Sequence, residues 1–119
     1  MVQINNFIRA LAFSTMVLAP TFASATVIEI ATFQLKDNVS YEIFAPLDKA
    51  VEMQHVTKQP GFISRESAKG KNGDWLVVVH WESEEDAQAS MNSFMSAPAA
   101  AGFMEAIDTS TMSMQHYVK

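Results

Sequence analysis

The order of hydrophobic and polar positions predicts the chain's elements, beginning with a hairpin near its centre. Two apolar runs, Phe62 to Ala68 and Trp75 to Trp81, are separated by a polar segment. That segment contains the step Asn72-Gly73, and an Asn-Gly step between two such runs is the strongest short-range signal for a β-hairpin. The stretch from Gly61 to Ser83 therefore predicts two antiparallel strands joined by a tight turn.

The segment before the hairpin predicts a strand followed by a helix. Thr26 to Lys36 carries apolar residues on both alternating sets, which is typical of a central strand covered on both faces. From Ile43 onward the apolar residues fall within one helical stripe about 100° wide. Because proline is tolerated only in the first turn of a helix, we expect the main helix to begin near Pro46. We expect it to end before Pro60-Gly61.

Two further helices are predicted after the hairpin. Ser83 is followed three residues later by Asp86, which resembles a helix-opening capping box. The apolar residues of this helix follow the helical spacing at Ala87, Met91, Phe94 and Met95. Pro98 ends it and opens a short third helix, whose apolar side is expected to consist of Phe103, Met104 and Ile107.

Thr109 to Val118 predicts the last strand, and the complete order is β-α-β-β-α-β. Two β-α-β halves of this kind form a four-stranded antiparallel sheet with both main helices on one face, the ferredoxin-like α+β fold. In the first and third strands, the side chains on both faces are apolar. The sheet face that carries no helices would therefore expose a contiguous apolar patch. A second copy can cover this patch, and the sequence predicts a homodimer.

The N-terminus has the pattern of a signal peptide. Arg9 is the only charge before Glu29, Ala10 to Ala19 is apolar, and Ala23-Ser24-Ala25 fits a signal peptidase site. The apolar run is too short for a spanning helix, which needs about 20 residues. We therefore expect residues 1–25 to be a signal peptide cleaved after Ala25, and residues 26–119 to form one domain that is periplasmic or secreted, without stable membrane association after cleavage.

The net charge and the cysteine content of the chain argue against several classes of partner and of chemistry. The chain has a formal net charge of −5 and no basic run, which argues against nucleic acid and anionic membrane surfaces as partners. It has no cysteine, so thiol catalysis and thiolate metal sites are excluded.

Three segments carry a resemblance to a known family: Gln59 to Phe62 at the helix-to-strand turn, Val77 to Ser83 at the strand-to-helix corner, and Phe94 with Pro98 to Phe103 after it. In these segments the chain resembles the antibiotic biosynthesis monooxygenase-like (ABM) family of the dimeric α+β barrel superfamily. The resemblance covers Val27 to Val118 and implies the fold and the dimer. The family includes cofactor-free oxygenases of hydroxyaromatic and quinone-like compounds, haem-degrading enzymes, isomerases and proteins of no assigned activity.

The resemblance also allows the haem-degrading branch to be tested. Its members use an Asn in the first strand, a Trp in the second helix and a His about ten residues further on. This chain has Phe33, Ser90 and Ala100 at those places, which argues against haem degradation. The resemblance favours a monooxygenase, or a binder, of small hydroxyaromatic or quinone-like molecules that uses no cofactor, so the partner that it implies is a small-molecule ligand.

Such a reaction needs a base and an apolar pocket, and histidine suits the first task because its pKa lies near working pH. The two histidines on predicted strands, His80 and His116, are the candidate bases. Aromatic residues could form the walls of a site for a flat substrate: Phe33, Trp75, Trp81 and Tyr117. The alternative for His80 is a hydrogen bond within the core or the dimer interface.

A different class of function is suggested by Met112, Met114 and His116, which share one face of the last strand. Thioether and imidazole form a soft ligand set suited to copper(I) in an exported protein without thiols. Methionine also fills irregular gaps in cores, which is the structural alternative. A periplasmic copper-binding protein and a non-catalytic ligand-binding dimer therefore stay open beside the oxygenase.

Overall fold

The computed structural model describes residues 25–119. The signal peptide predicted for residues 1–25 lies outside this part of the chain, apart from Ala25 at its end. Within the described residues, no helix is both long enough and apolar enough to cross a membrane.

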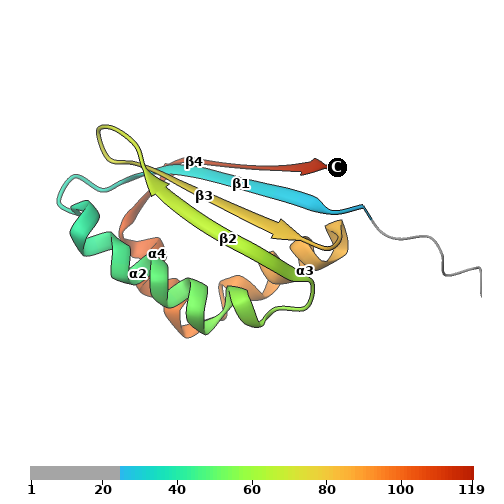
Figure 1. Ribbon diagram of the computed structural model, residues 1–119. Helices are drawn as coiled ribbons and strands as arrows, with labels where there is room; N and C mark the ends of the chain where they lie inside the picture. Colours follow the sequence, from blue (N-terminus) through green and yellow to red (C-terminus); the bar gives the residue numbers. More distant parts are fainter. Residues whose placement is uncertain (1–24) are drawn as a thin grey trace, which may run out of the picture.

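The described residues form a single antiparallel sheet covered on one face by helices (Figure 1). In chain order the elements are β1 (Val27–Leu35), α2 (Tyr41–Gln54), the 3₁₀ turn η2 (Val56–Lys58), β2 (Phe62–Lys69), β3 (Asp74–Trp81), α3 (Glu84–Phe94), α4 (Pro98–Glu105) and β4 (Ile107–Val118).

The sheet has the strand order β2-β3-β1-β4, with β1 and β3 in the centre and β2 and β4 at the edges. All three strand pairs are antiparallel, and α2, α3 and α4 lie together on the same side (Figure 1). This is the ferredoxin-like α+β arrangement, so the predicted fold class is confirmed.

The predicted hairpin forms because its turn residues suit the conformation that the strands require. Asn72 and Gly73 have φ angles of 55° and 85°, and the Asp74 N–H donates to the Lys71 carbonyl at 3.0 Å. Two adjacent residues with positive φ define a type I′ turn, whose twist matches that of the flanking strands. The Tyr41 hydroxyl accepts from the Gly73 N–H at 2.9 Å and so ties this turn to the start of α2.

The expected start of the first helix was wrong by about one turn. Helix α2 begins at Tyr41, because Ser40 caps it by accepting a hydrogen bond from the Ile43 N–H at 3.2 Å. Pro46 therefore lies inside the helix. It is exposed, as is Glu42, whose carbonyl loses its intrahelical partner there, so water can satisfy that carbonyl.

The cap predicted for α3 is confirmed, while two boundaries further on differ from the expectation. Ser83 accepts from the Asp86 N–H at 3.1 Å. Met95 follows the last residue of α3 and is 66% exposed, so it does not continue the buried stripe. Ile107 begins β4 and is buried there, two residues earlier than expected, because α4 ends at Glu105.

The core is densest between α2, α4 and the hairpin end of the sheet. Phe44 is fully buried and lies near three other aromatic rings, with centroid distances of 5.8 Å to Phe33, 4.9 Å to Trp75 and 5.2 Å to Phe103. Rings at these spacings, mostly edge-to-face, pack favourably and fill large volumes. The smaller side chains on the helix face of the sheet, Ala31, Val77 and Val79, lie in the middle of the sheet, and the site described next is located there.

The other face of the sheet is not covered by any of the described residues. Burial alternates along β1 and β3, with one set buried under the helices and the other partly exposed. The partly exposed set includes Ile28 and Ile30 on β1 and Leu76, Val78 and His80 on β3. The prediction that both faces of the central strands are apolar is correct, but one chain covers only one of them.

Candidate functional site

A cavity of about 330 Å³ lies between the sheet and its helices. Its volume is within the range of small-molecule sites, which are about 300–1,000 Å³ and mostly apolar. Its sheet wall comes mainly from β1 and β3, and its helix wall comes from α3 and α4, with residues such as Phe33, Val77, Trp81, Phe94 and Phe103.

The cavity exists because small side chains face one another in this half of the fold. Ala31 and Val77 are paired across β1 and β3, and the buried Ser90 of α3 lines the same space. Where Phe33, Phe44 and Phe103 meet, large rings fill the equivalent layer. Packing at native density is therefore reached on one side only, and a hollow remains on the other.

Methionines form much of the cavity wall. Every methionine of the described residues except Met53 lines it: Met91, Met95, Met104, Met112 and Met114. Met95 and Met114 are also solvent-exposed, so the cavity reaches the surface between the end of α3 and β4. Methionine is flexible and polarizable, so this wall can adapt to ligands of different outline and make favourable contacts with aromatic rings.

One row across the sheet supplies the charged groups around the cavity. Val79 of β3 is paired with Arg65 of β2 on one side and with Glu29 of β1 on the other. Glu29 is in turn paired with His116 of β4. Residues opposite one another in a sheet project from the same face, so this row points toward the helices. Glu29 and Arg65 both line the cavity.

Glu29 is the acidic residue of the cavity wall, and it is only 8% exposed. The Trp81 indole N–H donates to its Oε1 at 3.1 Å, and His116 Nε2 lies 3.0 Å from its Oε2. Both carboxylate oxygens therefore have partners, which a buried charged group requires. These contacts hold the carboxylate at the edge of an otherwise apolar space.

His116 lies between two carboxylates. Its Nε2 contacts Glu29, and its Nδ1 is 2.8 Å from Oε2 of Glu84 in the first turn of α3. Partial burial lowers the pKa of His116, but the hydrogen bonds and negative charges of Glu84 and Glu29 outweigh burial, so the pKa is raised above 6.5. An imidazolium that donates from both nitrogens satisfies both carboxylates at once.

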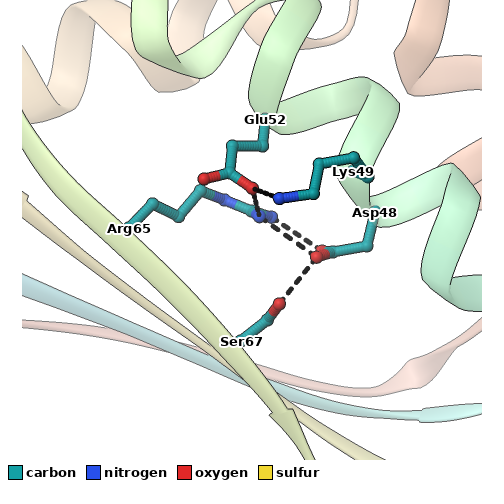
Figure 2. A network of polar contacts seen from close by, with 5 residues as sticks. All are labelled: Asp48, Lys49, Glu52, Arg65 and Ser67. Carbon is teal, nitrogen blue, oxygen red and sulfur yellow. Dashed lines mark hydrogen bonds and ion pairs between the residues drawn. The ribbon is translucent and has the colours of Figure 1, made fainter.

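Figure 2 shows a second polar network, between α2 and β2, and its Arg65 also lines the cavity. The Arg65 guanidinium donates to both carboxylate oxygens of Asp48, at 2.8 and 3.1 Å, and the Ser67 hydroxyl donates to Asp48 at 2.7 Å. Glu52 lies 3.9 Å from Arg65 and 3.1 Å from Lys49. The Arg65–Asp48 pair joins α2 to the edge strand β2 and places the Arg65 side chain in the cavity wall.

The residues predicted from sequence as catalytic or substrate-binding are distributed over both faces of the sheet. Phe33 and Trp81 line the cavity. Trp75 shares their face but packs in the aromatic core beside Phe44. His80 and Tyr117 are both paired with Ile28, so they lie on the uncovered face, away from the cavity.

The proposed metal ligands are only partly brought together. Met112 and Met114 line the cavity, and His116 lies on the same face behind Glu29. Both imidazole nitrogens of His116 already contact carboxylates. Over residues 25–119, no group of three or more His, Cys, Asp and Glu side chains is arranged to hold a metal ion.

Sequence reasoning missed Glu29 and Glu84 as members of the site. A signal was present for Glu29, since it is the only charge in an otherwise apolar central strand before its end. A lone acid in such a strand must find a partner or face a cavity. Glu84 has no such signal, because acids are common in a first helical turn for reasons of the helix dipole alone.

Comparison with known proteins agrees with this fold. The family model for antibiotic biosynthesis monooxygenase matches residues 26–106. None of the curated proteins compared with the chain is significantly similar to it. The match covers more than half of the chain, and the chain therefore belongs to the antibiotic biosynthesis monooxygenase family.

Solved structures with the same fold have low sequence identity to the chain. A mutant of SnoaB, a cofactor-independent oxygenase from Streptomyces nogalater, is 13% identical with a TM-score of 0.66, over 81% of this chain and 94% of that one. A conserved protein of unknown function from Bacteroides thetaiotaomicron is 10% identical with a TM-score of 0.61, over 82% and 100%. A conserved protein from Methanosarcina mazei is 16% identical with a TM-score of 0.59, over 80% and 93%. At these identities the similarity shows the fold alone.

Proposed function

We propose that the cavity binds a small hydroxyaromatic or quinone-like molecule and that the protein oxidises it with dioxygen without a tightly held cofactor. The observation that carries this proposal is the carboxylate of Glu29 at the wall of an apolar, methionine-rich cavity. Family membership and the SnoaB-like fold support the reaction class. The apolar wall accepts a flat ring, while Glu29 can accept a hydrogen bond from a ring hydroxyl.

In the proposed reaction Glu29 takes the proton from the hydroxyl, and the resulting anion reacts with dioxygen. For a simple phenol, the O–H bond and the ring C–H bond opposite it break, and a new C=O bond forms at that ring carbon. The second oxygen atom leaves as water with the two hydrogens, and the substrate supplies all four electrons. The apolar wall limits the number of water molecules beside the anion and the developing peroxide.

This assignment changes the roles predicted for the histidines. Glu29 touches the cavity directly, and His116 acts behind it by holding its Oε2. The face on which His80 lies gives no support to its role as a base. For the copper alternative, neither imidazole nitrogen of His116 is free of a carboxylate contact, so we do not favour that function.

Oxygen uptake with a panel of quinols and hydroxyaromatics tests the proposal. We expect Glu29→Gln to lower the rate of uptake about 100-fold, the typical size of a general-base contribution. Glu85→Gln is the matched control, because Glu85 is an exposed acid in the first turn of α3 and is not among the residues that line the cavity. A Glu29→Gln variant that is as fast as wild type, or no uptake with any compound, would contradict the proposal.

We further infer that the protein is a homodimer in which the uncovered faces of two sheets pack together. The support is the apolar character of this face, which includes Ile30, Leu76 and Val78, and its lack of covering helices (Figure 1). Analytical ultracentrifugation should give twice the subunit mass, and Val78→Glu should give the subunit mass. Monomers of the unaltered protein at micromolar concentration would exclude this arrangement.

Export is part of the same proposal. The N-terminal pattern from Arg9 to Ala25 supports cleavage after Ala25 and release into the periplasm or the medium. Mass spectrometry of the protein recovered from its native cell should find Thr26 at the N-terminus. An intact N-terminus in the cytoplasmic fraction would contradict it.

A further inference from the structure

Three acid–base side chains form a continuous chain from the cavity to the protein surface. Glu29 lines the cavity and lies 3.0 Å from Nε2 of His116, whose Nδ1 lies 2.8 Å from Glu84. Glu29 is 8% exposed, whereas the Glu84 side chain is 54% exposed. We propose that this chain is a proton relay, with Glu84 as its outer terminus, which passes a proton to solvent whenever Glu29 takes one from a bound hydroxyl compound.

The relay works by charge compensation. Below its raised pKa, His116 is an imidazolium that donates to both carboxylates, and the Trp81 indole donates one N–H to Glu29. When Glu29 is protonated by a ligand, its negative charge is lost, and that charge is one of the reasons why the pKa of His116 is raised. His116 then releases its Nδ1 proton to Glu84, which passes it to water. One proton enters at Glu29 and one leaves at Glu84, and no electron is transferred.

The alternative is that Glu84 only ties α3 to β4. Two features favour the relay over a purely structural contact. The inner acid faces a space large enough for a ligand, and the imidazole is contacted on both nitrogens, which a relay needs and an anchor does not. The relay rests on the function proposed above, because it needs a ligand that protonates Glu29. It adds Glu84 as a positioning residue that acts through His116.

The test uses 4-nitrophenol, whose anion is coloured, mixed rapidly with the full-length mature protein and a pH indicator. In the wild type, bound phenolate and a released proton should appear together. In Glu84→Gln, whose amide cannot take up a proton, we expect proton release to slow about tenfold or more, and added acetate to restore part of the rate. Glu84→Asp, which keeps the carboxylate, should retain more of the rate than Glu84→Gln.

Glu85→Gln is the matched control, because Glu85 is an exposed acid of the same first turn and is not a hydrogen-bond partner of His116 in the described residues. Equal rates in Glu84→Gln, Glu85→Gln and wild type would overturn the relay, even if oxygen uptake is normal. Normal proton release without oxygen uptake from any quinol would instead overturn the oxygenase and leave the relay standing. No bound phenolate in the wild type would overturn both.

Discussion

Two polar networks at opposite edges of the same sheet differ in their access to water. At the β2 edge, the side chains of Arg65 and Asp48 are 3% and 5% exposed and hold each other through two hydrogen bonds (Figure 2). At the β4 edge, His116 joins the buried Glu29 to the exposed Glu84. Both networks contribute one side chain to the cavity wall, Arg65 in the first and Glu29 in the second.

The two networks differ in chemistry as well as in burial, because a guanidinium keeps its proton whereas an imidazole can exchange one. The Arg65–Asp48 pair is closed off from solvent at both side chains, so removing Asp48 leaves the guanidinium with Glu52, 3.9 Å away, as its remaining acidic partner. The His116 chain is open at one end, so its members can change protonation while the fold is kept. The first network should therefore control stability, and the second should control chemistry and its dependence on pH.

The largest expected effect on stability follows from breaking the closed network. Asp48→Ala should lower the free energy of unfolding by about 3–5 kcal/mol, because the buried Arg65 guanidinium loses both short hydrogen bonds and keeps only Glu52, 3.9 Å away, as an acidic partner. Urea denaturation measures the change. Lys49→Ala is the control on the same helix, and we expect it to cost less than about 1 kcal/mol because the Lys49 side chain is 67% exposed. Similar losses of unfolding free energy in the two variants would show that the Arg65–Asp48 pair stabilises the fold no more than an exposed ion pair does.

A smaller effect is expected at the N-terminus of α3, which carries the outer acid of the open network. Ser83→Ala removes the hydroxyl that accepts from the Asp86 N–H, and should cost about 1 kcal/mol of stability. Fraying of this turn should also weaken the contact of Glu84 with His116 and lower the pKa of the imidazole. Calorimetry and NMR titration measure the two changes, and the exposed Ser96→Ala serves as the control. If stability falls by the expected amount while the pKa of His116 is unchanged, Glu84 must be held in place by something other than this cap.

The smallest expected effect is the pH dependence of stability that His116 contributes. Since its pKa is raised in the folded protein, the stabilisation is fully present below the unfolded value of about 6.5. It is lost as the pH rises through the folded pKa. The difference in unfolding free energy between wild type and His116→Gln should therefore shrink from pH 6 upward. A difference that stays constant across this range would contradict the imidazolium between Glu29 and Glu84.

Much of the fold could be predicted from the sequence, because its signals act over a few residues. The Asn72-Gly73 turn, the Ser83 cap and the apolar alternation of the strands each depend on local backbone preferences, and the structure confirms them. Helix α2 starts earlier than predicted because the cap that Ser40 supplies outweighs the cost of Pro46 inside the helix. A proline penalty competes with capping and with burial of Phe44, and only the folded context decides the result.

The candidate site depended on contacts that no local pattern encodes. Glu29 and His116 are 87 positions apart in the chain, and they meet because β1 and β4 pair in one register. A register shift of one residue would turn His116 toward the uncovered face and bring its neighbours under the helices. The sequence by itself determined the elements, their order and the apolar surplus of the sheet. The tertiary structure alone decided which histidine stands behind the cavity, because side-chain direction in a sheet follows from long-range pairing.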